Sequence, residues 1–248
     1  MSRDLASGVV FAAFFAAVGG MANAACSGTL YLTFDTGNMR HAELIAETLA
    51  KYKAKATFFV ANERTLRGDQ ALDQAWAPYW QARAAEGHAF GSHTWRHGSF
   101  RQDQGKLTQY RLMDGKTEQL DSAAICSEIR RPDNRFKELT GRALDPLWRA
   151  PGGRTTALTL KAAETCGYRH VGWAPAGFLG DELPSGSYPN SLLVERALKN
   201  LKDGDIVMAH LGIWSRTDPF APALDELLAG LAARGFCFAT LPQGRKGS

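Results

Sequence analysis

Short apolar segments rich in β-branched and aromatic residues alternate with amphipathic helical segments along most of this chain. The strand-like segments begin with "TLYLTF" at residues 29–34 and continue with "KATFFVA", "HAFGSH", "LWRAP", "YRHVGWAP", "DIVMAH" and "FCFATL". Strands that alternate with helices of this length predict β-α-β units and a parallel sheet. About seven such strands are enough to close a barrel, so we expect an α/β fold with a closed or nearly closed sheet.

The rest of the sequence favours one ordinary globular domain. A chain of 248 residues can form a single α/β unit, and residues 102–140 are polar and helix-like, so we expect helix there. The formal charge is +4, but lysines and arginines form no stripe interleaved with aromatic residues. Nucleic acid is therefore not an expected partner.

The first residues have the pattern of a secretory signal. An arginine precedes an apolar run over residues 8–22, and Ala-Asn-Ala at residues 22–24 is a small-x-small cleavage pattern. The run is shorter than the ~20 residues that span a bilayer. We therefore expect a signal peptide at 1–24, a catalytic domain at 25–248, export to the periplasm or beyond, and no stable membrane insertion after cleavage. A retained helical anchor and a lipoprotein signal at Cys26 are the alternatives; Asn23 disfavours the second.

The mature chain would keep an even number of cysteines: Cys26, Cys126, Cys166 and Cys237. In an exported protein such a set more often forms disulfides than metal sites, and no Cys-x-x-Cys pair is present. Three pairings are open. If the first and last strands lie side by side, Cys26 pairs with Cys237 and Cys126 with Cys166, and we favour this pairing.

Polar side chains recur at the carboxyl ends of predicted strands: Asp35, His93, Arg149 and His210. In parallel α/β folds, active sites form at that end of the sheet. Buried structural polar residues would have no reason to choose this end repeatedly. The sequence therefore predicts a catalytic or binding site built from these four positions.

Two histidines in "SHTWRH" are candidate metal ligands. His93 and His97 are four residues apart, so both imidazoles would lie on one face if the segment is helical. An isolated pair of this kind is more often a surface feature. Two ligands also need a third from the protein, normally with water in the open position.

Together these segments resemble the polysaccharide deacetylase family, also called the NodB-homology or carbohydrate esterase family 4 enzymes. The resemblance covers residues 29–241, and the motifs follow the family's order: "TFDTG", "HTWRH", "RAPGG", the looser "GWAPAGFLGD" and "VMAH". It implies an irregular, incomplete (β/α) barrel of about seven parallel strands. It also implies metal-assisted hydrolysis of an N- or O-acetyl group on a sugar polymer.

The resemblance also implies roles for individual residues. Asp35 matches the catalytic base, Arg149 the residue that pairs with this base, and His210 the general acid. His93 and His97 match metal ligands. Zinc is the expected ion, with cobalt and nickel as alternatives.

Four further positions follow from the same motifs. The backbone amide of Gly152 would line the oxyanion site, and Trp173 and Met208 would form walls of the acetyl pocket. Asp181 matches the carboxylate that tunes the general acid, although its spacing after Trp173 departs from the usual fourth motif.

The first motif departs from the family pattern at Thr36, where a second, metal-binding aspartate is usual. Three hypotheses are open. The metal is held by His93, His97 and Thr36 or a water; Asp35 itself ligates it; or the site is empty and the protein is a glycan-binding pseudoenzyme. We favour the first, because Asp35 and its catalytic partners serve no purpose in sugar binding alone.

The sequence therefore predicts an exported metal-dependent deacetylase whose partner is an acetylated glycan. Peptidoglycan or an exopolysaccharide is preferred over chitin oligomers as the substrate. An esterase that removes O-acetyl groups from a polysaccharide is the alternative within the same chemistry.

Overall fold

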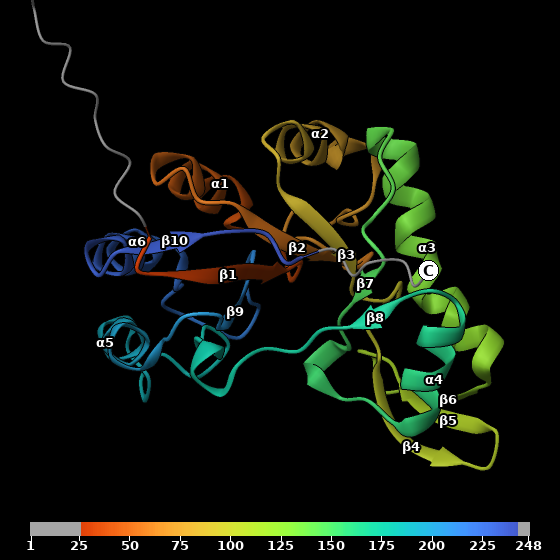
Figure 1. Cartoon of the computed structure of the whole chain (residues 1–248). Coiled ribbons are helices and arrows are strands. Elements are labelled where there is room, and N and C mark those ends of the chain that lie inside the picture. The colour runs from red at the N-terminus through yellow and green to blue at the C-terminus, as the bar shows by residue number, and fades with distance from the viewer. Residues whose placement is uncertain (1–25, 243–248) are drawn as a thin grey trace, which may run out of the picture.

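A computed structural model describes residues 26–242, and the predicted signal peptide lies outside these residues. Within residues 26–242, seven parallel strands form one curled sheet in the order β10-β1-β2-β3-β7-β8, with β9 also paired to β1 (Figure 1). Their bounds are β1 Gly28–Asp35, β2 Ala56–Val60, β3 Ala89–Ser92, β7 Leu147–Trp148, β8 Arg169–His170, β9 Ile206–His210 and β10 Phe236–Phe238. Within the described residues β8 pairs only with β7, so the barrel stays incomplete, and the predicted fold class is confirmed.

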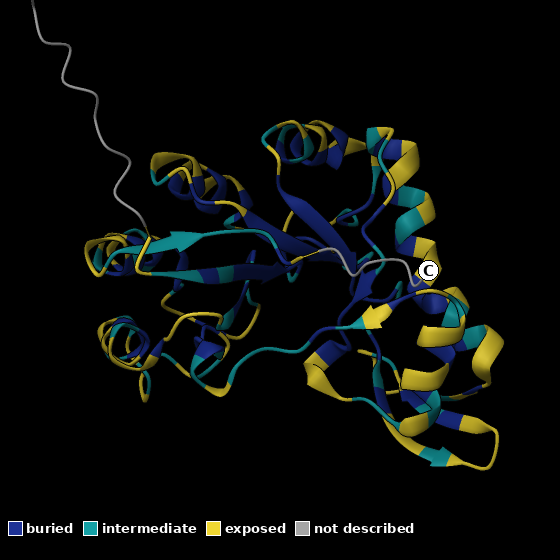
Figure 2. Cartoon of the chain, viewed as in Figure 1, coloured by how far each residue is buried: buried dark blue, intermediate teal, exposed yellow. Residues whose placement is uncertain are grey.

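Helices flank the sheet. They are α1 Ala42–Lys51, α2 Ala77–Ala85, α3 Ser122–Thr140, α4 Ala157–Thr165, α5 Asn190–Asn200 and α6 Leu224–Ala233, with short 3-10 turns η1 Gln74–Trp76, η2 Pro151–Gly153, η3 Pro175–Gly177 and η4 Ala221–Ala223. Figure 2 shows buried strands at the centre and exposed outer faces on the helices. Among residues 26–242, no helix has the length and apolar character needed to cross a membrane.

The centre of the core is aromatic. Every residue of β2 is buried, as expected for a strand covered on both faces in a parallel sheet. Phe58 of this strand stacks between Phe34 and Phe90, with ring centroids 5.9 and 5.8 Å apart. This packing fixes β1, β2 and β3 relative to one another, and with them the side chains that follow each strand.

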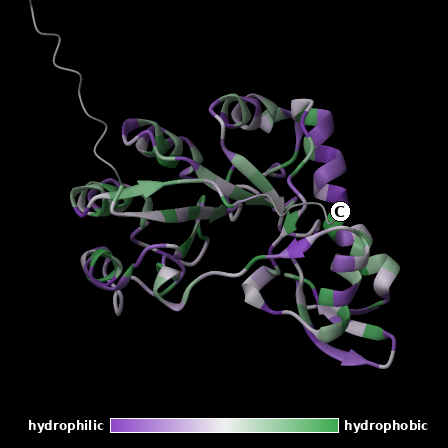
Figure 3. Ribbon diagram, viewed as in Figure 1, coloured by the Kyte–Doolittle hydropathy of each residue, from purple (hydrophilic) through white to green (hydrophobic). Residues whose placement is uncertain are grey.

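The helix predicted over residues 102–140 is wrong in its first half. Residues 99–120 form a separate antiparallel sheet of β4 Ser99–Gln104, β5 Leu107–Arg111 and β6 Thr117–Leu120. Only α3 is helical in this stretch. In Figure 3 this small sheet is mostly hydrophilic, unlike the central sheet.

Turn chemistry and side-chain alternation explain the small sheet. Gly105 and Gly115 occupy the two turns with φ of 63° and 87°, a left-handed conformation that suits glycine. The second turn contains Asp-Gly, a strong hairpin signal. Phe100 and Tyr110 are buried and lie opposite each other in register. The strands therefore have one core face and one outer face.

Two disulfides match the pairing favoured from the sequence. Cys26 bonds to Cys237, next to the pairing of β1 with β10. Cys126 bonds to Cys166 and so joins α3 to the end of α4.

Candidate active site

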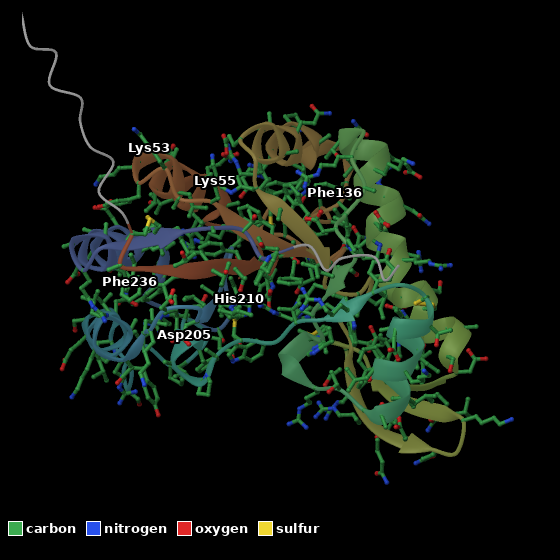
Figure 4. All side chains as sticks on the ribbon, viewed as in Figure 1. Lys53, Lys55, Phe136, Asp205, His210 and Phe236 are labelled. Carbon is green, nitrogen blue, oxygen red and sulfur yellow. A yellow bond between two sulfur atoms is a disulfide. The ribbon has the colours of Figure 1, made fainter. Side chains whose placement is uncertain are left out.

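The carboxyl ends of β1, β3, β7 and β9 meet at one pocket of about 470 Å³. Figure 4 labels His210 near the centre of the molecule, where β9 ends. The predicted residues that line the pocket are Asp35, His93, His97, Gly152, Trp173, Met208 and His210. Most of the predicted site residues therefore lie together at one edge of the sheet, as expected for polar residues at the ends of parallel strands.

Asp35 is paired with a fully buried arginine. Nη1 of Arg149 donates to Oδ1 of Asp35 at 2.9 Å, and Asp35 is 3% exposed. The guanidinium also donates to Thr33 Oγ1 and to the carbonyls of Val171 and Gly172. Burial alone would raise the pKa of Asp35, but the charge of Arg149, with a smaller contribution from His210, brings this pKa below its ordinary value. Asp35 is therefore held as a carboxylate.

His93 is held as a neutral imidazole. Its Nδ1 lies 2.9 Å from the carbonyl oxygen of Arg149, and a carbonyl can only accept a hydrogen bond. Nδ1 therefore carries the proton, and Nε2 presents a lone pair. Burial lowers the pKa of His93 to about 3, so this imidazole is uncharged near neutral pH.

His97 directs its own Nε2 to the same place. The Nε2 atoms of His93 and His97 lie 3.2 Å apart, and Oδ2 of Asp35 lies 3.5 Å from Nε2 of His93. On the other side of the His97 ring, Nδ1 is 3.2 Å from Oε1 of Glu63, without the alignment of a hydrogen bond. The ring of His97 therefore lies between the Glu63 carboxylate and Nε2 of His93.

The histidine motif is not helical, which corrects the geometry expected from its spacing. Residues 93–98 form a loop in which Thr94 and His97 have φ of 64° and 50°. These left-handed positions interrupt any helical repeat between β3 and β4. The two imidazoles meet because of this loop and not because of a helical repeat.

Thr36 does not reach the pocket. Its hydroxyl accepts from the amide of Ala61 at 3.0 Å and donates to the carbonyl of Phe59 at 3.4 Å, and the residue has no exposed surface. Both partners belong to β2 or its end. The hydroxyl is thus engaged by backbone, and the geometry gives no support to Thr36 as a metal ligand.

Asp181 positions His210 through contacts with its ring and its backbone amide. Oδ1 of Asp181 lies 3.0 Å from Nδ1 of His210, and Oδ2 accepts from the His210 amide at 2.8 Å. Burial alone would lower the pKa of His210, but Asp181 and, more weakly, Asp35 and Glu182 raise it to about 9. The imidazole is therefore protonated at neutral pH.

The remaining predicted residues form walls. Gly152 lines the pocket within η2, with φ of 61°. The ring of Trp173 packs against Gly153, where an added Cβ would lie 2.8 Å from the ring, and it stacks on Phe178 at 6.4 Å. Met208 contributes from β9. The catalytic and binding roles of these residues stay predictions.

Several site residues were missed by sequence reasoning. Glu63 follows the carboxyl end of β2, so the strand-end rule could have found it. Glu182 lines the pocket, with Oε2 3.7 Å from Nε2 of His210. One further wall comes from β4 and β5, in a stretch where the sequence predicts a helix.

The donor set suits a divalent metal ion in part. The Nε2 atom of His93 lies near Nε2 of His97 and near Oδ2 of Asp35, and imidazole nitrogens and carboxylate oxygens are ligands of the kind that zinc binds. Among the described residues, however, no cluster of three or more histidine, cysteine or acidic side chains is arranged to hold a metal. The pair His93 and His97 therefore fits as two ligands of an open site.

A known protein family and characterised proteins are similar to much of this sequence. Residues 22–171 match the family model for polysaccharide deacetylase. A peptidoglycan-N-acetylglucosamine deacetylase of Bacillus cereus is 27% identical over 217 residues, which cover 86% of this chain and 85% of that protein. A chitooligosaccharide deacetylase of Azorhizobium caulinodans is 25% identical over 228 residues, which cover 86% of this chain and 93% of that protein.

Solved structures share the fold. A family 4 acetyl xylan esterase from Clostridium thermocellum, in complex with a cobalt ion, has a TM-score of 0.66 and 21% identity, with 86% of this chain and 87% of that chain covered. A family 4 pseudoenzyme from Bacillus anthracis has a TM-score of 0.65 and 17% identity, with 86% and 64% covered. At these identities the likeness shows a common fold and no more.

Proposed function

Because the chain belongs to the polysaccharide deacetylase family of hydrolases that cleave N-acetyl amide bonds, we propose that it is an exported, metal-dependent deacetylase of an N-acetylated glycan. One observation carries this proposal. Asp35 and His210 are register partners on the neighbouring strands β1 and β9, and both line the same pocket. Their buried partners hold them in opposite states, one as a carboxylate and one as an imidazolium. Two titratable groups set apart in this way are a base and an acid.

The chain's own residues account for the proton transfers. Asp35, held in place by Arg149, takes a proton from the attacking water. The backbone amide of Gly152 donates to the oxyanion as the carbonyl carbon becomes tetrahedral. His210 then gives its proton to the leaving nitrogen, which departs as the free amine while acetate is formed.

We place the metal at His93 and His97. When bound there, a divalent ion supplies Lewis-acid polarisation of the acetyl carbonyl and a lower pKa for water. Zinc is proposed first, with cobalt or nickel as alternatives, since imidazole suits all three. The cobalt-bound acetyl xylan esterase is a relative by fold that supports a metal in this family.

Glu63 is expected to tighten metal binding through His97. Its Oε2 accepts from the Gly37 amide at 2.9 Å, which fixes the carboxylate while Oε1 faces His97. Carboxylates behind a histidine ligand typically change metal affinity by about 10- to 100-fold. We therefore expect Glu63→Gln to weaken zinc binding by about that factor, measured by competition with a chromogenic chelator. The matched variant Glu47→Gln, on the exposed face of α1, should bind zinc like the wild type. Equal zinc affinity of all three proteins would show that Glu63 does not contribute to metal binding.

Peptidoglycan or an exopolysaccharide is the proposed substrate, with chitin oligomers next. The Bacillus cereus relative is named for N-acetylglucosamine in peptidoglycan, and the Azorhizobium relative for chitooligosaccharide. Export is proposed because two disulfides tie the fold together, as is usual outside the cytosol.

Acetate release tests the proposal directly. Metal-stripped protein is re-supplied with zinc, cobalt or nickel and assayed on N-acetylglucosamine oligomers, peptidoglycan and an O-acetylated xylan, with His93→Ala in parallel. We expect release from the N-acetylated substrates that requires both metal and His93. Faster release from the O-acetylated polymer would assign the esterase activity instead.

A second candidate, a glycan-binding protein without hydrolysis, is favoured by the position of Thr36. Its hydroxyl faces β2, so the pocket lacks the anionic ligand that the usual first motif supplies. A family 4 pseudoenzyme with the same fold also supports this candidate. It predicts glycan binding with no acetate release under any of the three metals.

A further inference from the structure

The small antiparallel sheet places two arginines at the mouth of the pocket. Arg101 lies on β4 and Arg111 on β5, and both line the pocket together with Ser99. Ser99 and Arg111 are direct register partners, so these side chains belong to one face of the sheet. Phe100 and Tyr110 occupy the other face and are buried in the core. Arg111 thus follows the alternation that packs the sheet, and Arg101, at the register shift between Phe100 and Asp103, also lines the pocket.

A third arginine comes from a different element. Arg154 directly follows η2 and also lines the pocket. It is two residues beyond Gly152, the residue expected to line the oxyanion site. Cationic groups from the small sheet and from the segment after η2 therefore face the same opening.

These three guanidinium groups have no acidic partner in the described part of the chain. Arg101, Arg111 and Arg154 are exposed, and none takes part in an ion pair among residues 26–242. Arg96, on the same side of the molecule, is by contrast neutralised by Glu118 and Glu128. The arginines without an acidic partner thus lie at the pocket mouth, while their neighbour outside the lining is paired.

The acidic residues of the pocket do not balance this charge. Asp35 is already paired with the buried Arg149, which leaves Glu182 as the remaining carboxylate in the lining. The mouth therefore carries three guanidinium charges against one carboxylate. A neutral polymer would form no ion pair with these groups, whereas guanidinium groups bind carboxylates with charge-assisted, often bidentate hydrogen bonds.

We propose that the pocket selects an acidic glycan, in which sugars next to the N-acetylated residue carry carboxylate groups. This inference rests on the proposed deacetylase function and narrows its substrate class. Arg101, Arg111 and Arg154 bind the carboxylates of the flanking sugars, and the acetyl group reaches Asp35 and His210 at the bottom of the pocket. The neighbouring charges also steer an anionic chain towards the opening.

A matched pair of substrates isolates the charge. Oligosaccharides that alternate N-acetylglucosamine with glucuronic acid are compared with the same oligosaccharides after reduction of each carboxyl to a primary alcohol. N-Acetylglucosamine oligomers serve as a third, neutral substrate. Acetate release gives kcat/KM for each, at low ionic strength and at high salt. We expect the wild type to prefer the charged form by about tenfold, and this preference to shrink in salt.

In the variant Arg101→Gln/Arg111→Gln/Arg154→Gln, kcat/KM for the charged oligosaccharide should fall to about the value for the carboxyl-reduced oligosaccharide, a ratio of about one. The change should appear mainly in KM. A matched control, Arg196→Gln/Lys199→Gln/Lys202→Gln, removes the same charge on and after α5, which lies at the other end of the molecule from β4–β6 (Figure 1). We expect it to keep the wild-type ratio.

Three outcomes would overturn the inference. A wild-type ratio near one, or an equal loss of ratio in both triple variants, would mean that the pocket arginines do not select charge, while release from neutral oligomers would leave the deacetylase function standing. No release from any substrate would overturn the proposed function itself, and this inference with it.

Discussion

Replacing Asp35 by asparagine is expected to lower kcat/KM for acetate release by about 10³-fold or more. An amide cannot take the proton that Asp35 receives, and loss of a positioned base typically costs about 10²- to 10⁴-fold. The loss should appear in kcat. The amide oxygen of the introduced side chain would still accept the hydrogen bond from Nη1 of Arg149, so the side chain keeps its place.

The same substitution should also destabilise the fold, because it leaves Arg149 as a buried cation without its counter-charge. Breaking a buried ion pair by removing one partner costs about 3–5 kcal/mol. Urea unfolding at neutral pH measures this loss, and activity is compared at a temperature where the variant is fully folded.

Asp225→Asn is the matched control, because Asp225 pairs with Lys51 on the exposed surface, outside the pocket lining. It should keep activity within about twofold and lose little stability. A folded Asp35→Asn protein with near wild-type kcat would show that Asp35 is not the catalytic base.

Much of this site could be predicted from strand ends. Asp35, His93, Arg149 and His210 each close an apolar run, and in a parallel sheet such positions have to converge. The seven strands were also visible, since each apolar run is short and separated from the next by a helical segment. The sequence rule works here because topology, and not side-chain detail, brings the residues together.

The small sheet was missed because its residues are polar. Only Phe100, Thr108, Tyr110 and Leu120 are buried in β4–β6, too few to give a clear alternation. The Asp-Gly turn at Gly115 was the available signal. Because a helix was expected here, nothing in the sequence indicated that Arg101 and Arg111 lie at the pocket.

The contacts of Thr36 and Glu63 could not be predicted from spacing. Thr36 follows Asp35 in the sequence, but its hydroxyl forms hydrogen bonds with backbone groups in and just after β2. The residues next to Thr36 in the sequence do not reveal these partners. Glu63 is far from His97 in the sequence and meets it only because β2 and β3 are neighbours. Such contacts depend on tertiary structure.

Replacing His210 by alanine is expected to lower kcat by about 10²- to 10⁴-fold while zinc content stays unchanged, because His210 supplies a proton and is not a proposed ligand. Zinc bound per protein is measured together with acetate release. Loss of metal on this substitution would contradict the assignment of His210 as the acid.

Asp181→Asn separates the acid role from a structural one through the pH profile. Against the effect of burial, Asp181 raises the pKa of His210 from its ordinary 6.5 to about 9, so the imidazolium persists well above neutral pH. Without this carboxylate burial dominates and the pKa falls, so the alkaline limb of kcat should move to lower pH and activity should recover on acidification. The stability that this pair contributes is fully present below about pH 6.5 and is lost as the pH rises through about 9, because the folded-state pKa is the higher one. Wild-type unfolding free energy should therefore fall over this window more steeply than that of Asp181→Asn. An unmoved alkaline limb in a folded variant would show that another group delivers the proton to the leaving nitrogen.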